Sequence, residues 1–239
     1  MMTSVHGYFN MLIETDMERY RAETFLTKEP ETIAWINDMQ PGEVLYDVGA
    51  NVGVYTLYAA SRGIRVVAIE PVLENYVRLV RNIEMNGFKN VVPLYGAAGP
   101  YSQVSRELYV RSMDAGASGG QIIAPIGQDG DEFTPQCERM IPIYSLDDNH
   151  LPLWMPQHIK IDVDGKEEYV LMGTIKILPA KALKSMLIEI NPNQFSGMKV
   201  YFEIMGYTTD NKYNTMTPHS RERRQREGIA AENVIFTRR

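Results

Sequence analysis

The sequence predicts an α/β fold in which helices cover both faces of a mostly parallel sheet. Short, nearly continuous apolar runs are typical of strands buried on both faces, and amphipathic segments alternate with these runs along the chain. The chain has 239 residues and no internal repeat or low-complexity linker, which favours one domain. We predict an N-terminal helical segment over residues 1–43, which covers the substrate or the cofactor, and a main domain over residues 44–239.

Strand and helix alternate from the start of the main domain. The predicted elements are a helix over 31–39, a strand over 44–48, a helix over 54–62 and a strand over 65–69. Pro41 and Gly42 end the first helix, since both residues disfavour its continuation. The two strands are apolar along almost their whole length, so we expect both of their faces to be buried.

A longer amphipathic helix is predicted over 73–87, where Asn86 and Gly87 supply its C-terminal cap. Its apolar stripe is expected to hold Leu73, Val77, Val80 and Ile83, and its solvent face Glu74, Arg78, Arg81 and Glu84. A third strand follows over 91–94. Residues 99–140 then interrupt the alternation, because they are rich in Gly, Ser, Asp and Pro. We interpret them as an antiparallel insertion after the third strand, with strand pieces at 107–110 and 140–144.

The alternation resumes after the insertion. We predict a strand over 158–163, a helix over 166–178, a strand over 185–190, a helix over 198–206 and a final strand over 233–237. In parallel sheets, ligands bind beyond the carboxyl ends of the strands. Polar residues that follow these strands are therefore the first candidates for a functional site.

Composition excludes several classes of protein. The net charge of −6 argues against a general nucleic-acid partner. The single cysteine, Cys137, excludes an internal disulfide and an all-cysteine zinc site. No apolar run reaches the roughly 18 residues of a membrane span, and the first residues do not have the pattern of a signal peptide. We therefore expect a cytoplasmic protein.

A glycine-containing loop follows the first predicted strand. The residues Asp47-Val-Gly-Ala-Asn-Val-Gly53 would let the backbone approach a ligand closely. Glu70 ends the next strand, 21 residues after Gly49, where a carboxylate can bind both hydroxyls of a ribose. The alternative is a tight turn beside an acidic strand end. The loop differs from the G-x-G-x-x-G pattern of nicotinamide enzymes, which favours S-adenosylmethionine over a dinucleotide.

The order of these motifs resembles that of the FkbM-type methyltransferases over roughly residues 29–191. The resemblance rests on the glycine loop, Glu70-Pro71, the acidic turn Ser145–Asp148, the strand end Ile159–Gly165 with Glu167, and Leu187–Ile190. It implies a class I methyltransferase fold, Rossmann-like, with a seven-stranded mostly parallel sheet whose last strand is antiparallel. It also implies methyl transfer from S-adenosylmethionine to oxygen. Residues 28–32 are similar to those of members that modify glycans.

The resemblance also implies which residues hold the cofactor. Asp47, Gly49, Asn51 and Gly53 would surround its methionine part, and Glu70 its ribose. Family members often carry an acid near the adenine after the third strand, but this chain has Ala97-Ala98-Gly99-Pro100 there. Adenine contacts are therefore expected from backbone, including that of Ala98, or from elsewhere. The chain also has Asp164 and Lys166 where the family usually has Glu and Ala.

Catalytic candidates lie at the ends of the later strands. Asp162 is the first candidate for a general base, although a structural pair with Lys160 is an equal alternative on sequence grounds. Glu189 and Asn191 lie two apart at the next strand end, so they share one face. With Asp162 they could bind Mg²⁺, but polar residues that line a substrate pocket are the expected reading, and no metal is expected. Asp164 and Glu167 fit a helix capping box.

Charge is concentrated near the C-terminus. Residues 211–239 carry a net charge of +4, against −10 for the rest of the chain. Arg223 and Arg224 are predicted to bind an anionic acceptor, and His219 is a second candidate for the base. The alternative is a solvated surface segment. The overall hypothesis is an O-methyltransferase for a glycan or similar acceptor. Its rivals are an inactive cofactor-binding partner module and a nicotinamide oxidoreductase, and a homo-oligomer is compatible with each of them.

Overall fold

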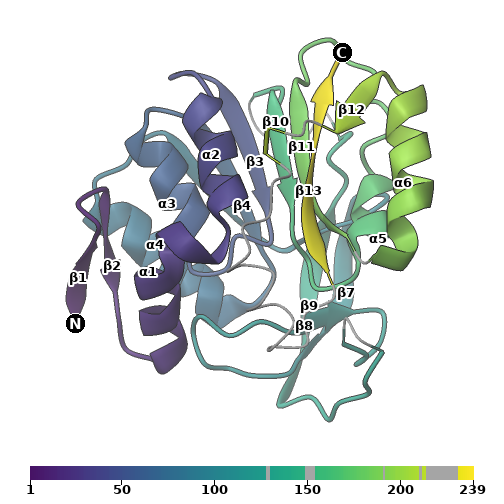
Figure 1. The fold of residues 1–239 in the computed structure, drawn as a ribbon. Helices are drawn as coiled ribbons and strands as arrows, with labels where there is room; N and C mark the ends of the chain where they lie inside the picture. Colours follow the sequence, from purple (N-terminus) through teal and green to yellow (C-terminus); the bar gives the residue numbers. More distant parts are fainter. Residues whose placement is uncertain (128–129, 149–153, 191, 210–211, 214–230) are drawn as a thin grey trace.

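A seven-stranded sheet forms the centre of the computed structural model, which describes residues 1–127, 130–148, 154–190, 192–209, 212–213 and 231–239 (Figure 1). Its strands are β3 (Val44–Val48), β4 (Arg65–Glu70), β5 (Val91–Tyr95), β10 (His158–Ile161), β11 (Ser185–Ile190), β12 (Tyr207–Thr209) and β13 (Glu232–Arg238). Their order is β12-β13-β11-β10-β3-β4-β5. The parallel strands of this sheet are β5, β4, β3, β10 and β11. Strand β13 is antiparallel to both of its neighbours.

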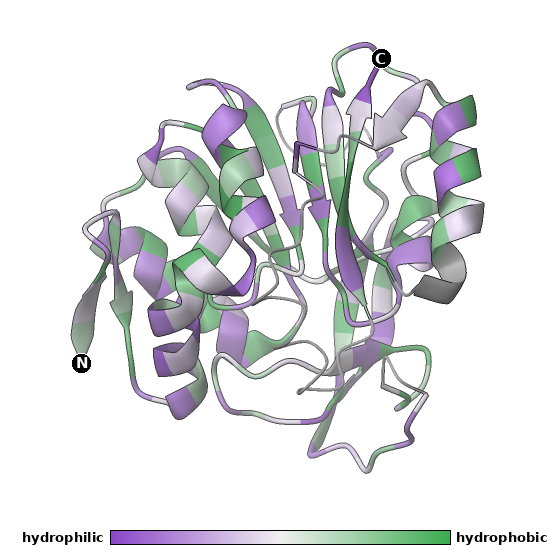
Figure 2. Cartoon of the chain, in the orientation of Figure 1, coloured by the Kyte–Doolittle hydropathy of each residue, from purple (hydrophilic) through white to green (hydrophobic). Residues whose placement is uncertain are grey.

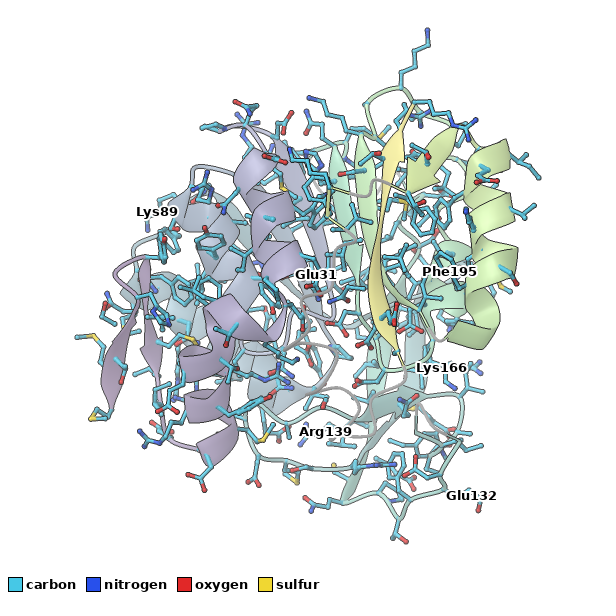
Figure 3. The ribbon with its side chains drawn as sticks, in the orientation of Figure 1. Glu31, Lys89, Glu132, Arg139, Lys166 and Phe195 are labelled. Atoms are coloured by element: carbon cyan, nitrogen blue, oxygen red, sulfur yellow. The ribbon has the colours of Figure 1, made fainter. Side chains whose placement is uncertain are left out.

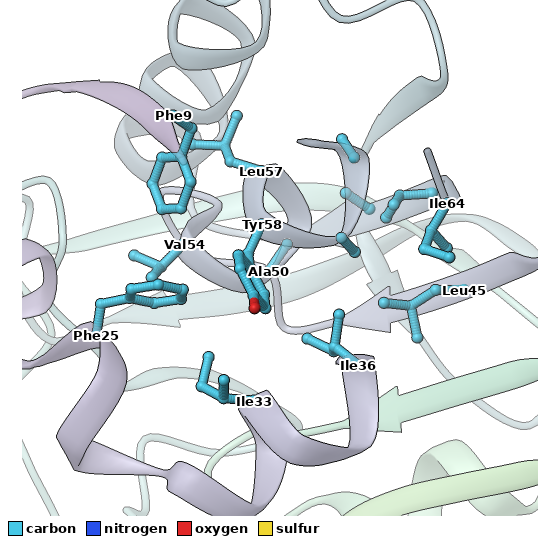
Figure 4. Close-up of a cluster of buried hydrophobic side chains, with 14 of the residues drawn as sticks. Phe9, Phe25, Ile33, Ile36, Leu45, Ala50, Val54, Leu57, Tyr58 and Ile64 are labelled. Atoms are coloured by element: carbon cyan, nitrogen blue, oxygen red, sulfur yellow. The ribbon is translucent and has the colours of Figure 1, made fainter. Parts of the chain in front are cut away.

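Helices cover both faces of this sheet, as the alternating pattern predicts. They are α1 (Asp16–Lys28), α2 (Pro30–Asp38), α3 (Val54–Ser61), α4 (Leu73–Met85), α5 (Glu167–Leu171) and α6 (Pro192–Ile204). Neighbouring residues of β3 belong to different cores, because successive side chains of a strand point to opposite faces. Leu45 packs with α1 to α4 (Figure 4), and Tyr46 packs with α5 and α6. In the described part of the chain, no helix is long and apolar enough to cross a membrane.

Figure 2 shows hydrophobic residues along the length of the central strands. Every residue of β3 is buried, including Asp47, and five of the six residues of β4 are buried. Burial on both faces explains why these strands lack an alternating polar pattern. The functional residues that follow them therefore stand on a rigid base.

The N-terminal segment was predicted to be helical, but it begins with a hairpin of β1 (Met2–Val5) and β2 (Phe9–Leu12). Two asparagines of the α4 region hold the hairpin. The side-chain oxygen of Asn82 accepts a hydrogen bond from the Leu12 amide at 3.0 Å, and that of Asn86 accepts one from the Asn10 amide at 2.7 Å. The hairpin depends on these contacts with the α4 region, which is about 70 residues away, so residues 2–12 alone do not predict it.

The predicted apolar stripe of α4 is wrong in part. Leu73 and Val77 are 39% and 40% exposed, whereas Arg78 is buried. The guanidinium of Arg78 contacts Glu14 at 2.6 Å and the buried Glu18 at 2.9 Å. The buried face of α4 is therefore partly polar, because the N-terminal segment supplies partners for its charge.

The insertion after β5 forms a second sheet with a small apolar core of its own. Its strands are β6 (Ala97–Ala98), β7 (Gln103–Val110), β8 (Gly120–Ile122) and β9 (Cys137–Tyr144), in the order β6-β9-β7-β8. Strand β7 is antiparallel to both of its neighbours. The insertion is not antiparallel throughout, because β6 pairs with β9 in parallel.

The helix predicted over 166–178 is much shorter than expected, since α5 ends at Leu171. The turn that follows brings Gly173 against the backbone of Gly99, where a side chain would overlap the Gly99 carbonyl. The carboxylate of Asp147 then accepts hydrogen bonds from the amides of Lys176 and Ile177 at 2.9–3.0 Å. These contacts between distant segments end the helix, although its sequence pattern continues.

A buried polar chain joins the amino ends of the central strands. The indole nitrogen of Trp35 donates to the Ser185 hydroxyl at 2.8 Å, and this hydroxyl lies 2.8 Å from Nδ1 of His158. Because the indole can only donate, the serine proton is available to Nδ1, and Nε2 of His158 donates to Glu43 at 2.9 Å. Burial lowers the pKa of His158. This series of buried hydrogen bonds indicates a structural role for His158.

Candidate active site

The strand-end cavity, with a volume of about 250 Å³, lies beyond the carboxyl ends of β3, β4, β10 and β11. Six of the predicted site residues line it: Gly49, Asn51, Glu70, Ala98, Asp162 and Glu189. Asp47 and Gly53 do not line it. Asn191, His219, Arg223 and Arg224 lie outside the residues that the structure describes, so their roles stay predictions.

Both glycines of the loop after β3 have positive φ angles, +85° at Gly49 and +93° at Gly53. A side chain at Gly49 would overlap the carbonyl oxygen of Asp162, and one at Gly53 would overlap Leu79. The glycines are therefore required by the packing of the loop against β10 and α4, in addition to any contact with a ligand.

Asp47 lies beneath the loop and is only 1% exposed. Its Oδ2 accepts a hydrogen bond from the Thr56 hydroxyl at 2.6 Å, and its Oδ1 lies 4.0 Å from Nζ of Lys160. Burial raises the pKa of Asp47, while Lys160 and Thr56 oppose this rise. Its surroundings place it as a support for β10 and α3 rather than as a wall of the cavity.

Glu70 lines the cavity at the end of β4 and is held by backbone amides. Its Oε2 accepts from the Asn51 amide at 2.8 Å and its Oε1 from the Val72 amide at 2.9 Å. Burial raises the pKa of Glu70 to about 7, although these two hydrogen bonds lower it. The carboxyl group is thus fixed at the position where the sequence predicts ribose binding.

The pair of Lys160 and Asp162 is present, with Nζ of Lys160 donating to Oδ2 of Asp162 at 2.7 Å. Burial opposes the charge on Lys160, but Asp162, Asp47 and Glu29 raise its pKa above the ordinary value. Asp162 also lines the cavity, and its side chain is 26% exposed. Its Oδ1 makes no hydrogen bond to any described residue. One oxygen is therefore fixed by the lysine, and the other is available to a ligand.

Glu189 stands next to Asp162 in the sheet. Ile161 pairs with Val48 on one side and with Ile188 on the other, so the following residues Gly49, Asp162 and Glu189 occupy adjacent strand ends. Burial raises the pKa of Glu189 to about 8, and the Asp162 carboxylate adds to this rise. At this edge of the sheet, the Asp162 carboxylate, which Lys160 fixes, therefore stands next to the Glu189 carboxyl group, whose pKa is about 8.

We expect the free protein to become more stable as the pH falls from about 8 towards 5. Burial raises the pKa values of Glu70 and Glu167 to about 7 and that of Glu189 to about 8, against an ordinary value of 4.5 for glutamate. In this pH range the folded state binds more protons than the unfolded state, so stability decreases as pH rises. Denaturant unfolding at several pH values measures this slope. Glu189→Gln should flatten it, and an unchanged slope in that variant would contradict the assignment.

The capping box predicted for Asp164 and Glu167 is not formed. Helix α5 begins at Glu167, and Lys166 at its N-cap makes no side-chain cap. Asp164 has a φ angle of +53°, and its Oδ2 accepts from the Gly119 amide of the insertion at 2.9 Å. Oε1 of Glu167 instead accepts from the amides of Val163 and Gly165 at 3.2 and 3.0 Å. Both carboxyls stabilise the loop after β10.

Sequence analysis missed two groups of residues around the cavity. Arg21 and Lys28 reach it from α1, and Lys166, labelled in Figure 3, reaches it from the start of α5. The second group belongs to the insertion and comprises Ala117, Ser118, Gly119 and Gly120. The small residues of 115–120 could have indicated a close backbone approach, but nothing in the sequence gives their destination.

A metal site is not evident in the described part of the chain, where no group of three or more His, Cys, Asp or Glu side chains is arranged to hold an ion. Asp162 and Glu189 are neighbours, but the third predicted member of that group, Asn191, lies outside the described residues.

The fold is that of an α/β protein with a cavity at the carboxyl edge of a mostly parallel sheet. The sequence model of the methyltransferase FkbM domain matches residues 47–209, and the chain belongs to this family. It is an S-adenosylmethionine-dependent methyltransferase. The resemblance found in the motifs is therefore confirmed.

Solved methyltransferase structures have a similar arrangement at low sequence identity. The precorrin-6y C5,15-methyltransferase of Geobacter metallireducens GS-15 is 13% identical, with a TM-score of 0.47 over 95% of this chain and 93% of that chain. TYW2 of M. jannaschii, solved with AdoMet, is 14% identical, with a TM-score of 0.46 over 100% and 86%. A TehB-like SAM-dependent methyltransferase of Corynebacterium glutamicum is 12% identical, with a TM-score of 0.47 over 93% and 95%. Comparison with curated proteins gives no match.

Proposed function

We propose that this methyltransferase transfers its methyl group to a hydroxyl oxygen of a glycan or a similar small-molecule acceptor. The observation that carries the proposal is the pair of carboxyls, Asp162 and Glu189, at adjacent strand ends of one cavity. A hydroxyl is a poor nucleophile, so methyl transfer to its oxygen benefits from a group that accepts the hydroxyl proton. Asp162 offers an oxygen without a hydrogen-bond partner among the described residues, at the place where such a proton would leave.

The cavity fits the cofactor in its chemistry. Apolar side chains near Glu70, namely Ile69, Val72 and Ile122, offer a surface for a planar base. Glu70 lies beside them for the ribose hydroxyls, and the backbone of Gly49 and Asn51 is open to the methionine part. Acidic groups at the β10 and β11 ends suit a cationic sulfonium. We assign cofactor binding to Gly49, Asn51, Glu70 and Ala98 as walls, with Asp47 and Gly53 as supports of the loop.

S-Adenosylmethionine supplies a methyl group that is already activated by the sulfonium charge. The residues of the chain therefore align the acceptor and exclude water, and alignment of this kind can contribute on the order of 7–11 kcal/mol. Lys160 fixes Oδ2 of Asp162, so Oδ1 keeps one direction towards the cavity. Asp162 accepts the hydroxyl proton in this proposal. Glu189, whose pKa is about 8, passes that proton on or replaces Asp162 as the base.

The acceptor is proposed to carry an anionic group. The net charge of +4 over residues 211–239 supports this proposal, because arginine binds phosphate and carboxylate with paired hydrogen bonds. Substrate binding by Asn191, Arg223 and Arg224, and a base role for His219, belong to the same proposal. Arg21, Lys28 and Lys166 add positive charge to the cavity wall.

Ligand-dependent thermal unfolding, followed by an acceptor panel, tests the proposed function. S-Adenosylhomocysteine at about 100 times its Kd should stabilise the protein by about 2.7 kcal/mol, and NAD should not. Isotope-labelled cofactor should then label hydroxyl-bearing sugars or sugar phosphates, with the product resistant to mild base as an ether. Stabilisation by NAD alone would favour an oxidoreductase. Cofactor binding without transfer to any hydroxyl acceptor would favour an inactive partner module.

A further inference from the structure

A segment of the insertion crosses the strand-end cavity as a strap. We define the strap as residues 115–121, which lead from β7 into β8. Four of its residues, Ala117 to Gly120, line the cavity. The inserted sheet also supplies Ala97 and Ala98 of β6 and Ile122 of β8, so the strap is one of its contributions to the cavity wall.

Helix α1 fixes the start of the strap. The Thr15 hydroxyl at its N-cap donates to the Ala115 carbonyl at 2.7 Å, and Nε of Arg21 donates to the Gly116 carbonyl at 2.7 Å. Gly116 has a φ angle of +90° and lies against the Glu18 backbone, where a Cβ would be 3.0 Å from the Glu18 nitrogen. The strap therefore approaches α1 too closely for an ordinary side chain at this position.

Two asparagines clamp the middle of the strap. Nδ2 of Asn51 and Nδ2 of Asn75 both donate to the Ala117 carbonyl, at 2.9 and 3.0 Å. Oδ1 of Asn75 also accepts from the Gly116 amide at 2.8 Å. The side-chain amide of Asn51 is thus committed to the strap, and its Oδ1 accepts from the Val52 amide at 2.9 Å. This explains an asparagine in the glycine loop without a side-chain contact to the ligand.

Asn51 links the strap to the predicted ribose site. Its backbone amide donates to Oε2 of Glu70 at 2.8 Å, and its side-chain Nδ2 donates to the Ala117 carbonyl at 2.9 Å. The positions of the Glu70 carboxylate and the Ala117 carbonyl are therefore set by one residue, and Asn75 holds the same carbonyl from α4.

The far end of the strap is held at the loop after β10. Oδ2 of Asp164 accepts from the Gly119 amide at 2.9 Å, and Nε2 of Gln121 donates to the Asp164 carbonyl at 2.8 Å. Gly120 lies against Val72, where a Cβ would be 2.6 Å from a methyl carbon. The strap thus has fixed residues on both sides of Ser118. The Ser118 hydroxyl makes no hydrogen bond within the described part of the chain, and the residue lines the cavity.

We propose that the strap is a wall of the cofactor site for the nucleoside half of S-adenosylmethionine, and that the Ser118 hydroxyl hydrogen-bonds the bound nucleoside. The inference rests on the cofactor assignment of the proposed function. It follows from the link between the strap and Glu70 through Asn51, and from the placement of Ser118 between fixed residues in a cavity wall that also holds Val72 and Ile122. The insertion thus contributes to cofactor recognition in addition to any contact with the acceptor.

Calorimetric binding of two ligands to three variants tests this inference. S-Adenosylhomocysteine contains both halves of the cofactor, and 5′-methylthioadenosine contains the nucleoside without the amino acid. Ser118→Ala should weaken both by the same factor, about three- to tenfold, the scale of one lost hydrogen bond. Asn75→Ala should weaken both by at least about tenfold because it removes two of the hydrogen bonds that hold the strap. Tyr109→Phe is the matched control, since it removes an exposed hydrogen bond to Glu107 in the same sheet; its affinities should equal those of the wild type.

Hydrogen exchange supplies a second readout that does not depend on catalysis. Backbone amides of 116–120 should gain protection when either ligand binds to the wild type, and less protection in Ser118→Ala. Unchanged affinity of folded Ser118→Ala for both ligands would overturn the strap assignment alone. Loss of affinity for S-adenosylhomocysteine without loss for 5′-methylthioadenosine would also overturn it, because the contact would then be to the amino-acid half. Wild-type protein that binds neither ligand would overturn the cofactor site itself.

Discussion

Gly49→Ala is expected to lower the free energy of unfolding by at least about 3 kcal/mol, even in the absence of the cofactor. A methyl group at Gly49 overlaps the carbonyl oxygen of Asp162, and the φ angle of +85° is itself unfavourable for alanine. Strained backbone of this kind costs about 1–3 kcal/mol, and forced displacement in a packed site adds about 1–3 kcal/mol. For a domain of this size the melting temperature should fall by roughly 6 °C or more.

Gly42→Ala is the matched control for this prediction. Gly42 has a nearly identical φ angle of +88°, but a Cβ there meets nothing within 4 Å. The control therefore carries only the backbone cost, about 1 kcal/mol, and the difference between the two variants isolates the contact with Asp162. Equal stability of the two alanine variants in denaturant unfolding would contradict the close packing of the glycine loop against β10.

The same glycine illustrates how far the sequence predicts the site. The mostly apolar runs 44–48 and 185–190 predicted β3 and β11 residue for residue, because burial on both faces leaves a local signal. Gly49 and Asn51 of the loop after β3 line the cavity. The reason for its first glycine is a neighbouring strand more than a hundred residues away, and such a contact is not encoded in local spacing.

Errors in the prediction share a physical cause, which is the pairing of polar groups over long distances. The pattern placed Arg78 on the solvent face of α4, but Glu14 and Glu18 give it a buried ion pair. The pattern also made Asp164 a helix cap, but the Gly119 amide of the insertion takes its carboxylate. In both cases a partner from another segment stabilises a charge at a position that the local sequence pattern does not predict.

The two alternatives for Asp162, a structural pair and a catalytic group, are compatible in this geometry. Lys160 occupies Oδ2, and Oδ1 has no partner among the described residues. The bond to Lys160 fixes the orientation of the Asp162 carboxylate. Glu189 is the second candidate for the base, because burial raises its pKa to about 8, so the two carboxyls must be compared directly.

Asp162→Asn is expected to lower turnover by about 100-fold or more, the usual scale for a lost general base. The asparagine oxygen can still accept from Lys160, so its amide nitrogen takes the place of Oδ1 and presents a donor to the cavity. Melting temperature and affinity for S-adenosylhomocysteine should stay close to those of the wild type, which separates this variant from the glycine substitutions. The measurement is single-turnover methyl transfer at saturating cofactor over pH 6–9.

Glu189→Gln decides which carboxyl accepts the proton. If Asp162 is the base, Glu189→Gln should reduce turnover less than Asp162→Asn does. Glu189→Gln should also remove any increase in turnover with pH that follows the ionisation of Glu189, whose pKa is about 8. If Glu189 is the base, its variant should be the slower of the two. Asp131→Asn, which alters an exposed ion pair with Arg111 on the insertion, is the control for charge loss and should turn over normally. Near-normal turnover of correctly folded Asp162→Asn protein would remove Asp162 from catalysis and leave it as the partner that neutralises Lys160.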